Sequence, residues 1–188
     1  LDLALRRQRS EAELRAALEE ARHEVDRLAA LASRLLDLAA MGRVGLSLVE
    51  GDVAEVVAEA AAGCEAIAID RQIQVKVTSR GPVTARFDRS ALRQALDNLL
   101  SNALRFAPSG STIEVGAVRE GDRVRLTVKD AGPGVPADEA AKIFEPFYRR
   151  DREGGAGLGL AIVAEIARRH GGRACLAPSP KGAVFVIE

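Results

Sequence analysis

An acidic residue followed by a glycine-proline-glycine segment is the first place in this chain where the residues could do chemistry. Residues 124–129 alternate between apolar and polar side chains, which predicts a half-buried strand that ends at Asp130. Gly132 and Gly134 then remove side chains on both sides of Pro133, so the backbone can bend sharply and a flat ring can approach closely. The Asp130 carboxylate can accept a hydrogen bond from an amino group. An ordinary Gly-Pro turn is the alternative.

A second group of glycines, at positions 154, 155, 157 and 159, precedes a predicted helix whose apolar side carries Leu160, Val163, Ile166 and Ala167. Glycines at the start of a helix expose free N–H groups, which attract phosphate together with the helix dipole. The spacing fits neither the Rossmann nor the P-loop fingerprint, because no Lys-Ser/Thr pair follows the glycines. A flexible loop before an ordinary helix is the alternative. We interpret the two glycine segments together as a nucleotide pocket.

Residues 88–106 are predicted to form a helix with Asp88 as its N-cap. At about 100° per residue, one side of this helix is apolar, while Asn98, Asn102 and Arg105 share another side within about 60°. Two amides and a guanidinium on one stripe suit Mg²⁺ and phosphate, because hard cations take oxygen ligands and keep several waters. A solvated polar face is the alternative.

Four segments, in this order, resemble the ATP-binding domain of bacterial sensor histidine kinases, within the wider family that includes gyrase and the MutL mismatch-repair ATPases. The resemblance runs from about residue 44 to residue 188. Its segments are an N box at 98–103, a first glycine box at 130–134, an F box at 144–149 and a second glycine box at 155–163.

The resemblance implies a role for each matching residue. Asp130 would bind the adenine amino group, Asn102 and Asn98 would hold Mg²⁺, and Arg105 would contact the phosphates. The rest of the implied ATP site consists of Phe106, Gly132, Gly134, Ile143, Phe144, Phe147, Tyr148, Arg149, Gly155, Gly157, Leu158, Gly159 and Leu160. Residues 137–154 would form a lid over the nucleotide, since charge and glycine give low local stability. Phe144 and Phe147 are expected to fill the core as well as to belong to this lid, whereas for Arg150 and Arg152 a solvated position is the alternative.

The N-terminal part of the chain is predicted to be one long helix. Ser10 and Glu13 form a Ser-x-x-Glu capping box. The residues that follow repeat at spacings of four and three, as in a coiled coil: Leu14, Leu18, Ala21, Val25, Leu28, Ala32 and Leu35. This segment resembles the second helix of the dimerisation and phosphotransfer hairpin, which implies a homodimer through residues 14–38. A helix docked on its own domain is the alternative.

The remaining segments indicate an α+β fold. We expect strands at 44–50, 72–78, 83–87, 173–177 and 183–187, a hairpin of 111–118 with 123–130, and a helix from Asp52 to about residue 66. The strand at 83–87 is expected beside the strand at 72–78. The prediction is a two-layer α/β sandwich, with a mixed, largely antiparallel sheet covered by three helices and preceded by a long coiled-coil-type helix. The expected parts are 1–42, a partial phosphotransfer hairpin, and 43–188, the catalytic domain, with a hinge at 41–43.

The length and composition of the chain are consistent with a single hydrophobic core. The chain has 188 residues, of which 47% are hydrophobic. Its 27 Lys and Arg residues balance 27 Asp and Glu residues, so no net charge favours nucleic acid. The chain has no run of transmembrane length, so membrane contact is expected only through other segments of a membrane-anchored sensor, with this part in the cytoplasm. Cys64 and Cys175 are expected to be reduced core thiols.

The two histidines decide between function classes. His23 lies in a charged stretch unlike the family's phosphoacceptor segment and is expected to be solvated, while His170 is expected to end a helix as a cation near the negative end of the dipole. The prediction is therefore a histidine protein kinase module that transfers the γ-phosphoryl of ATP to a histidine elsewhere, for relay to a response regulator. A non-catalytic, dimerising ATP sensor is the alternative. Hydrolysis of the gyrase type is disfavoured, because Asn98 stands where hydrolysing relatives place a Glu and an amide is no general base.

Overall fold

The computed structural model describes residues 10–41, 45–149 and 157–188. The chain divides into two compact units, Leu1–Ala40 and Met41–Glu188. The predicted hinge at 41–43 lies largely outside the described residues, and so do Arg150 and Arg152 of the predicted lid. The functions expected of the two parts stay predictions.

Helix α1 (Glu11–Met41) begins at the predicted capping box. The Glu13 N–H donates to Ser10 Oγ at 3.3 Å, and the Ser10 N–H donates back to Glu13 Oε2 at 2.8 Å. The described apolar side chains of the helix are largely exposed, with fractions from 39% for Leu35 to 69% for Leu18. His23 belongs to this helix, and the prediction about its side chain lies outside what the structure describes.

The second unit contains a five-stranded sheet in the order β2-β4-β5-β7-β6. Only the β2–β4 pair is parallel, so the sheet is mixed and largely antiparallel, as predicted. The expected hairpin is present as β4 and β5. The bounds are β2 (Gln74–Val77), β4 (Thr112–Glu120), β5 (Arg123–Lys129), β6 (Ala174–Ala177) and β7 (Val184–Ile187).

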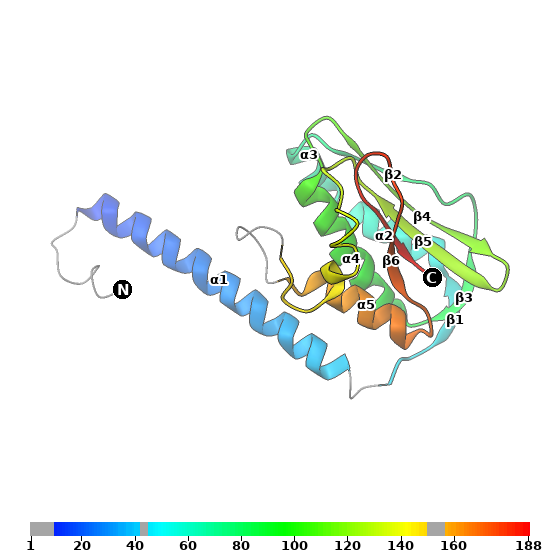
Figure 1. The fold of residues 1–188 in the computed structure, drawn as a ribbon. Helices are drawn as coiled ribbons and strands as arrows, with labels where there is room; N and C mark the ends of the chain where they lie inside the picture. Colours follow the sequence, from blue (N-terminus) through cyan, green and yellow to red (C-terminus); the bar gives the residue numbers. More distant parts are fainter. Residues whose placement is uncertain (1–9, 42–44, 150–156) are drawn as a thin grey trace. The chain divides into compact units, whose positions relative to one another are not determined.

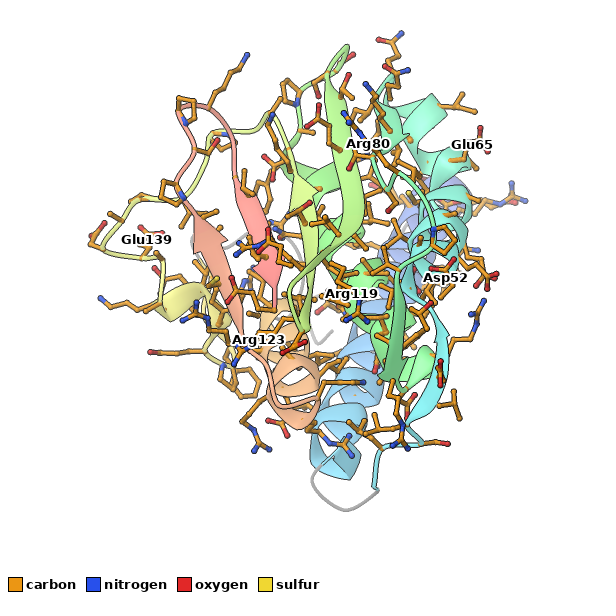
Figure 2. All side chains as sticks on the ribbon, turned by 90° about the vertical axis from the view of Figure 1, so that its right-hand side faces the viewer. Asp52, Glu65, Arg80, Arg119, Arg123 and Glu139 are labelled. Carbon is orange, nitrogen blue, oxygen red and sulfur yellow. The ribbon has the colours of Figure 1, made fainter. Side chains whose placement is uncertain are left out.

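The prediction that strand 83–87 lies beside strand 72–78 is wrong. Strand β3 (Thr84–Phe87) pairs with β1 (Val49–Asp52) in a separate antiparallel sheet. The chain after β2 stays on β4, because the Thr78 N–H donates to the Val115 carbonyl at 2.8 Å. Asp52 Oδ1 meanwhile accepts the Val83 N–H at 2.7 Å and brings β3 to β1. Arg119 at the end of β4, labelled in Figure 2, donates to the Thr84 carbonyl and attaches this small sheet to the large one.

Helices α2 (Val53–Gly63), α4 (Arg89–Phe106) and α5 (Gly159–Arg169) pack on one face of the large sheet, while Figure 2 looks onto the other face. The single helix expected to reach residue 66 instead ends at Gly63, and a short α3 (Glu65–Asp70) follows. Asp52 caps α2 through the Ala54 N–H at 2.9 Å. Glu55, three residues after this N-cap, lies 3.7 Å from the Arg89 guanidinium.

The core lies between these helices and the sheet (Figure 1). Its fully buried side chains include Leu96, Leu99, Leu100, Ile113, Val115, Leu158, Ile162, Ile166 and Phe185. These side chains join α4 and α5 to the sheet in one continuous apolar core, where removal of a methyl group would leave a destabilising cavity. Cys64 and Cys175 are half-buried free thiols, less buried than expected. In the part of the chain that the structure describes, no helix is long and apolar enough to cross a membrane.

Candidate nucleotide-binding site

Asp130 stands at the end of β5 and is 4% exposed, which makes it the one buried charged side chain among the described residues. Its Oδ1 accepts the Gly132 N–H at 2.8 Å and the Ala183 N–H at 3.2 Å. Its own N–H donates to the Ala183 carbonyl at 3.0 Å. Because both backbone N–H groups donate to Oδ1, Oδ2 is the oxygen that can accept a hydrogen bond from a ligand.

The first glycine segment closes against protein backbone. A Cβ on Gly132 would lie 2.8 Å from the Phe106 carbonyl oxygen at the end of α4. Gly134 has a φ of +74°, and a Cβ there would lie 2.9 Å from the Gly182 carbonyl oxygen. The absent side chains therefore make room for the chain's own backbone, and the close approach of a ligand ring stays a prediction.

Gly182 is a site residue that sequence reasoning missed. It has a φ of +72°, and a Cβ there would overlap the Asp130 carbonyl oxygen. Only glycine lets the β6–β7 connection pass this close, which brings the Ala183 N–H to Asp130 Oδ1. The available signal was a glycine directly before a predicted strand, in the segment Ser179-Pro180-Lys181-Gly182.

Helix α4 starts where predicted, because Asp88 Oδ1 accepts the Ala91 N–H at 3.0 Å. Asn98 is half-buried, and its Nδ2 donates to the Gln94 carbonyl at 2.8 Å. Its Oδ1 would lie 2.9 Å from a Cβ on Gly159. One end of the polar stripe therefore contacts the start of α5.

Asn102 is half-buried and lies about one helical turn from Asn98 and from Phe106. Since Asn98 contacts Gly159 and Phe106 contacts Gly132, Asn102 lies on α4 between the two glycine segments. Arg105 is exposed, with its Cζ 4.8 Å from the centroid of the Phe106 ring.

The second glycine segment contacts the F box through its backbone. The Gly157 carbonyl accepts the Phe147 N–H at 2.9 Å. Gly157 has a φ of +70°, and a Cβ there would lie 2.8 Å from the Tyr148 carbonyl oxygen. Leu158 is fully buried at the N-cap of α5, and its side chain does not cap the first N–H groups of this helix. Leu160 is half-buried, and Gly155 lies outside the described residues.

The F-box side chains separate into core and surface. Ile143 is buried, and the half-buried Phe144 ring meets the buried Phe185 ring of β7 edge-on with centroids 6.5 Å apart, so Phe144 packs against the core, in line with the expectation. Phe147 is 59% exposed at a φ of +67°, so the expectation that it also fills the core is wrong. The Gly157 bond holds its backbone turned outward. Tyr148 is half-buried and Arg149 is exposed.

His170 ends α5, but not as the expected cation. Its Nε2 accepts the Asp88 N–H at 3.0 Å, and its Nδ1 lies 2.8 Å from the Ile166 carbonyl oxygen. A nitrogen that accepts an N–H carries no proton, so Nδ1–H is the donor and the ring is neutral.

Metal ligation has one candidate set. Among residues 10–41, 45–149 and 157–188, no three His, Cys, Asp or Glu side chains come together as a metal site. The amide oxygens of Asn98 and Asn102, on one side of α4, are the pair that the sequence predicted for Mg²⁺.

A sheet with a buried acceptor at a strand end, flanked by a polar helix and two glycine segments, defines a nucleotide-binding class of protein. Residues 87–188 match the family model described as histidine kinase-, DNA gyrase B- and HSP90-like ATPase. The chain belongs to this family.

Proteins similar to this chain include a sensor protein and a signal transduction histidine-protein kinase. Sensor protein IrlS of Burkholderia pseudomallei (strain K96243) is 36% identical over 177 residues, which cover 90% of this chain and 38% of that protein. Histidine-protein kinase BaeS of Escherichia coli (strain K12) is 40% identical over 121 residues, which cover 62% of this chain and 26% of BaeS. The crystal structure of full-length ShkA in complex with AMPPNP aligns with a TM-score of 0.81 and 33% identity, over 95% of this chain and 39% of ShkA. This chain thus carries the ATP-binding domain of the sensor histidine kinase type and spans less than half of these relatives.

Proposed function

We propose that this chain is the catalytic module that transfers the γ-phosphoryl group of ATP to a histidine, for relay to a response regulator. The observation that supports this best is the arrangement of α4 between the two glycine segments. Asn98 contacts Gly159 at one point, and Phe106 contacts Gly132 about two turns further along. The acceptor Asp130 lies beside the second of these contacts, since its Oδ1 binds the Gly132 N–H.

Asp130 selects the base in this proposal. Its Oδ1 is held by two backbone N–H groups, so the carboxylate has a fixed orientation, and Oδ2 accepts the adenine amino group. A buried charged acceptor is specific, because a base without a matching donor leaves it unsatisfied.

Asn98, Asn102, Arg105 and the start of α5 serve the phosphates. The amide oxygens of Asn98 and Asn102 fit Mg²⁺, which when bound would neutralise phosphate charge and orient the γ-phosphate. The N-cap residue Leu158 provides no side-chain cap, so the first N–H groups of α5 favour an anion there. Phe147 and Arg149, both exposed, are the lid residues proposed to contact the nucleotide.

Transfer to a histidine is favoured over hydrolysis. The position four residues before Asn102 is Asn98, whose Nδ2 already donates to the Gln94 carbonyl. Such an amide cannot take a proton from water near neutral pH. The nucleophile is therefore a histidine positioned by another segment, and neither His23 nor His170 is proposed for that role.

The assembly completes the proposal. Exposed apolar side chains on α1 form a seam that pairs with a second copy of the chain. A receiver domain of a response regulator then takes the phosphoryl group. We place this module on the cytoplasmic side of a sensor whose other segments anchor it in the membrane.

Incubation with γ-labelled ATP and Mg²⁺ tests the function. The chain alone should remain unlabelled, whereas a separate helical hairpin that contains an acceptor histidine should acquire acid-labile label. Asn102→Ala is the matched loss-of-function control. Label on His23, or no label on any added hairpin while ATP binds normally, would contradict the proposal.

A further inference from the structure

Asp88 and His170 join the N-terminal end of α4 to the C-terminal end of α5. The Asp88 carboxylate caps α4 through the Ala91 N–H at 3.0 Å and the Ser90 hydroxyl at 2.7 Å, and its Oδ2 accepts the Ser47 N–H at 2.9 Å. The Asp88 N–H is the group that donates to His170 Nε2, at 3.0 Å. One side chain of α5 thus bonds to the backbone of the α4 N-cap, 82 residues away in sequence.

Capping of α5 does not require the imidazole. The His170 N–H already donates to the Ile166 and Ala167 carbonyls at 3.1 Å, and the Gly172 N–H donates to the Ala167 carbonyl at 2.9 Å. The additional bond from Nδ1 to the Ile166 carbonyl instead fixes the ring so that Nε2 points at Asp88. The distinctive contribution of the ring is the bridge between the two helices.

The Asp88–His170 bond and the candidate nucleotide site lie at opposite ends of the contact between α4 and α5. Asn98 follows Asp88 by ten residues along α4, and Gly159 precedes His170 by eleven along α5, or about 15 and 16 Å at 1.5 Å per residue. The two helices are in contact, and they run antiparallel, because the start of α4 meets the end of α5 at Asp88 and His170 while Asn98 meets the start of α5 at Gly159. A slide of one helix would therefore stretch the Asp88–His170 bond and move Asn98 off Gly159 together. Hydrogen bonds tolerate only a few tenths of an ångström.

We infer that His170 is a positioning residue for the Mg²⁺–nucleotide site: its bond to Asp88 holds α4 in register with α5 and so keeps Asn98 beside Gly159. The inference rests on the proposed function, because Asn98 matters there as a Mg²⁺ ligand. It predicts that loss of the bridge impairs the Mg²⁺-dependent part of nucleotide binding more than the adenine-dependent part, which is set by Asp130.

The test compares His170→Asn with His170→Gln. The Asn amide reaches the place of Nδ1 but not Asp88, whereas the longer Gln side chain can place an acceptor where Nε2 was. The readout is the Mg²⁺ gain, defined as the ratio of the Kd for ATP in EDTA to the Kd with Mg²⁺. His170→Asn should reduce this gain about tenfold, a difference of about 1.4 kcal/mol, with little change in EDTA. His170→Gln should restore most of it.

Arg168→Ala is the control, because it removes only the exposed pair with Glu165 at the same helix end. If His170 had a purely structural role, His170→Asn and His170→Gln would both lower Tm, and both would keep the Mg²⁺ gain of the unsubstituted chain. That result would overturn the inference. If the unsubstituted chain shows no Mg²⁺ gain at all, the proposed metal site fails and the inference fails with it.

A measurement without nucleotide separates the bridge from the site. The ¹⁵N shifts of the ring should show Nδ1 protonated and Nε2 unprotonated, and the Asp88 amide should exchange faster in His170→Asn than in His170→Gln. A ring protonated on Nε2 in the folded protein would contradict the bridge, whatever the nucleotide results.

Discussion

Asn98 and Gly159 stand so close that a methyl group on the glycine would lie 2.9 Å from the asparagine Oδ1. The atom in the way is the end of a side chain, whereas the groups that crowd Gly132 and Gly157 include backbone carbonyls. Substitution of Gly159 therefore displaces one proposed Mg²⁺ ligand and leaves the backbone in place.

Gly159→Ala should weaken Mg²⁺–ATP binding without unfolding the domain. Alanine at the first residue of α5 gains up to about 1 kcal/mol of helix propensity, which offsets the rotation of Asn98. We expect the Mg²⁺ gain in affinity to fall on the order of tenfold, with Tm unchanged or slightly higher. Gly45→Ala, where a Cβ meets nothing within 4 Å, is the control for calorimetry. An unchanged Mg²⁺ gain would argue against Asn98 as a ligand.

Asp130→Asn should remove the adenine acceptor and preserve the fold. The Asn oxygen can replace Oδ1 for the Gly132 and Ala183 N–H groups, which leaves an NH₂ group facing the adenine amine. Two opposed donors should cost about 1–3 kcal/mol, or roughly tenfold to a hundredfold in ATP affinity. Titration calorimetry measures this, with Asp122→Asn in the exposed β4–β5 turn as the control. Wild-type affinity in Asp130→Asn would remove the pocket assignment.

Asp88→Asn should make the folding stability less dependent on pH at low pH. Burial alone would raise the pKa of the Asp88 carboxyl, but hydrogen bonds from Ala91, Ser90 and Ser47 outweigh it and lower the pKa to about 2 from 3.8. The carboxylate therefore stabilises the fold fully above about pH 4, and this contribution is lost as the pH falls toward 2, because the unfolded chain binds the proton first.

Denaturant melts of both proteins between pH 2 and pH 6 measure this contribution. The stability difference between wild type and Asp88→Asn should shrink by on the order of 1 kcal/mol across the acid range, after allowance for solvent screening of this half-buried group. A difference independent of pH would show that the hydrogen bonds do not depend on the charge.

Leu28→Glu should convert dimers to monomers. Leu28 is 54% exposed on α1 and belongs to the four-three seam, where a partner helix would bury it. A charge there would be desolvated without a partner, which opposes association. Ala16→Glu, exposed and off the seam, should leave the dimer intact. Light scattering at several concentrations checks both variants, and a strictly monomeric unsubstituted chain would contradict pairing through this seam.

The sequence by itself determined the elements whose signals are local. The Ser10–Glu13 box, the Asp88 cap and the alternation that ends at Asp130 involve residues within a few positions of each other. The hairpin follows from Gly121 in its turn, with a φ of +62°. The order and spacing of the glycine and asparagine motifs were sufficient to indicate the family, because each motif consists of residues that are contiguous in the sequence.

The tertiary structure alone decided the contacts between distant segments. The pairing of β3 with β1, the passage of Gly182 over Asp130, the outward turn of Phe147 and the neutral His170 all involve partners that lie far apart in sequence or backbone angles set by such partners. Periodicity shows which face of an element is apolar, but the neighbour of that face depends on how all the elements pack at once. For the same reason, the histidine that sequence placed at a helix end as a cation is, in the fold, an acceptor for another helix.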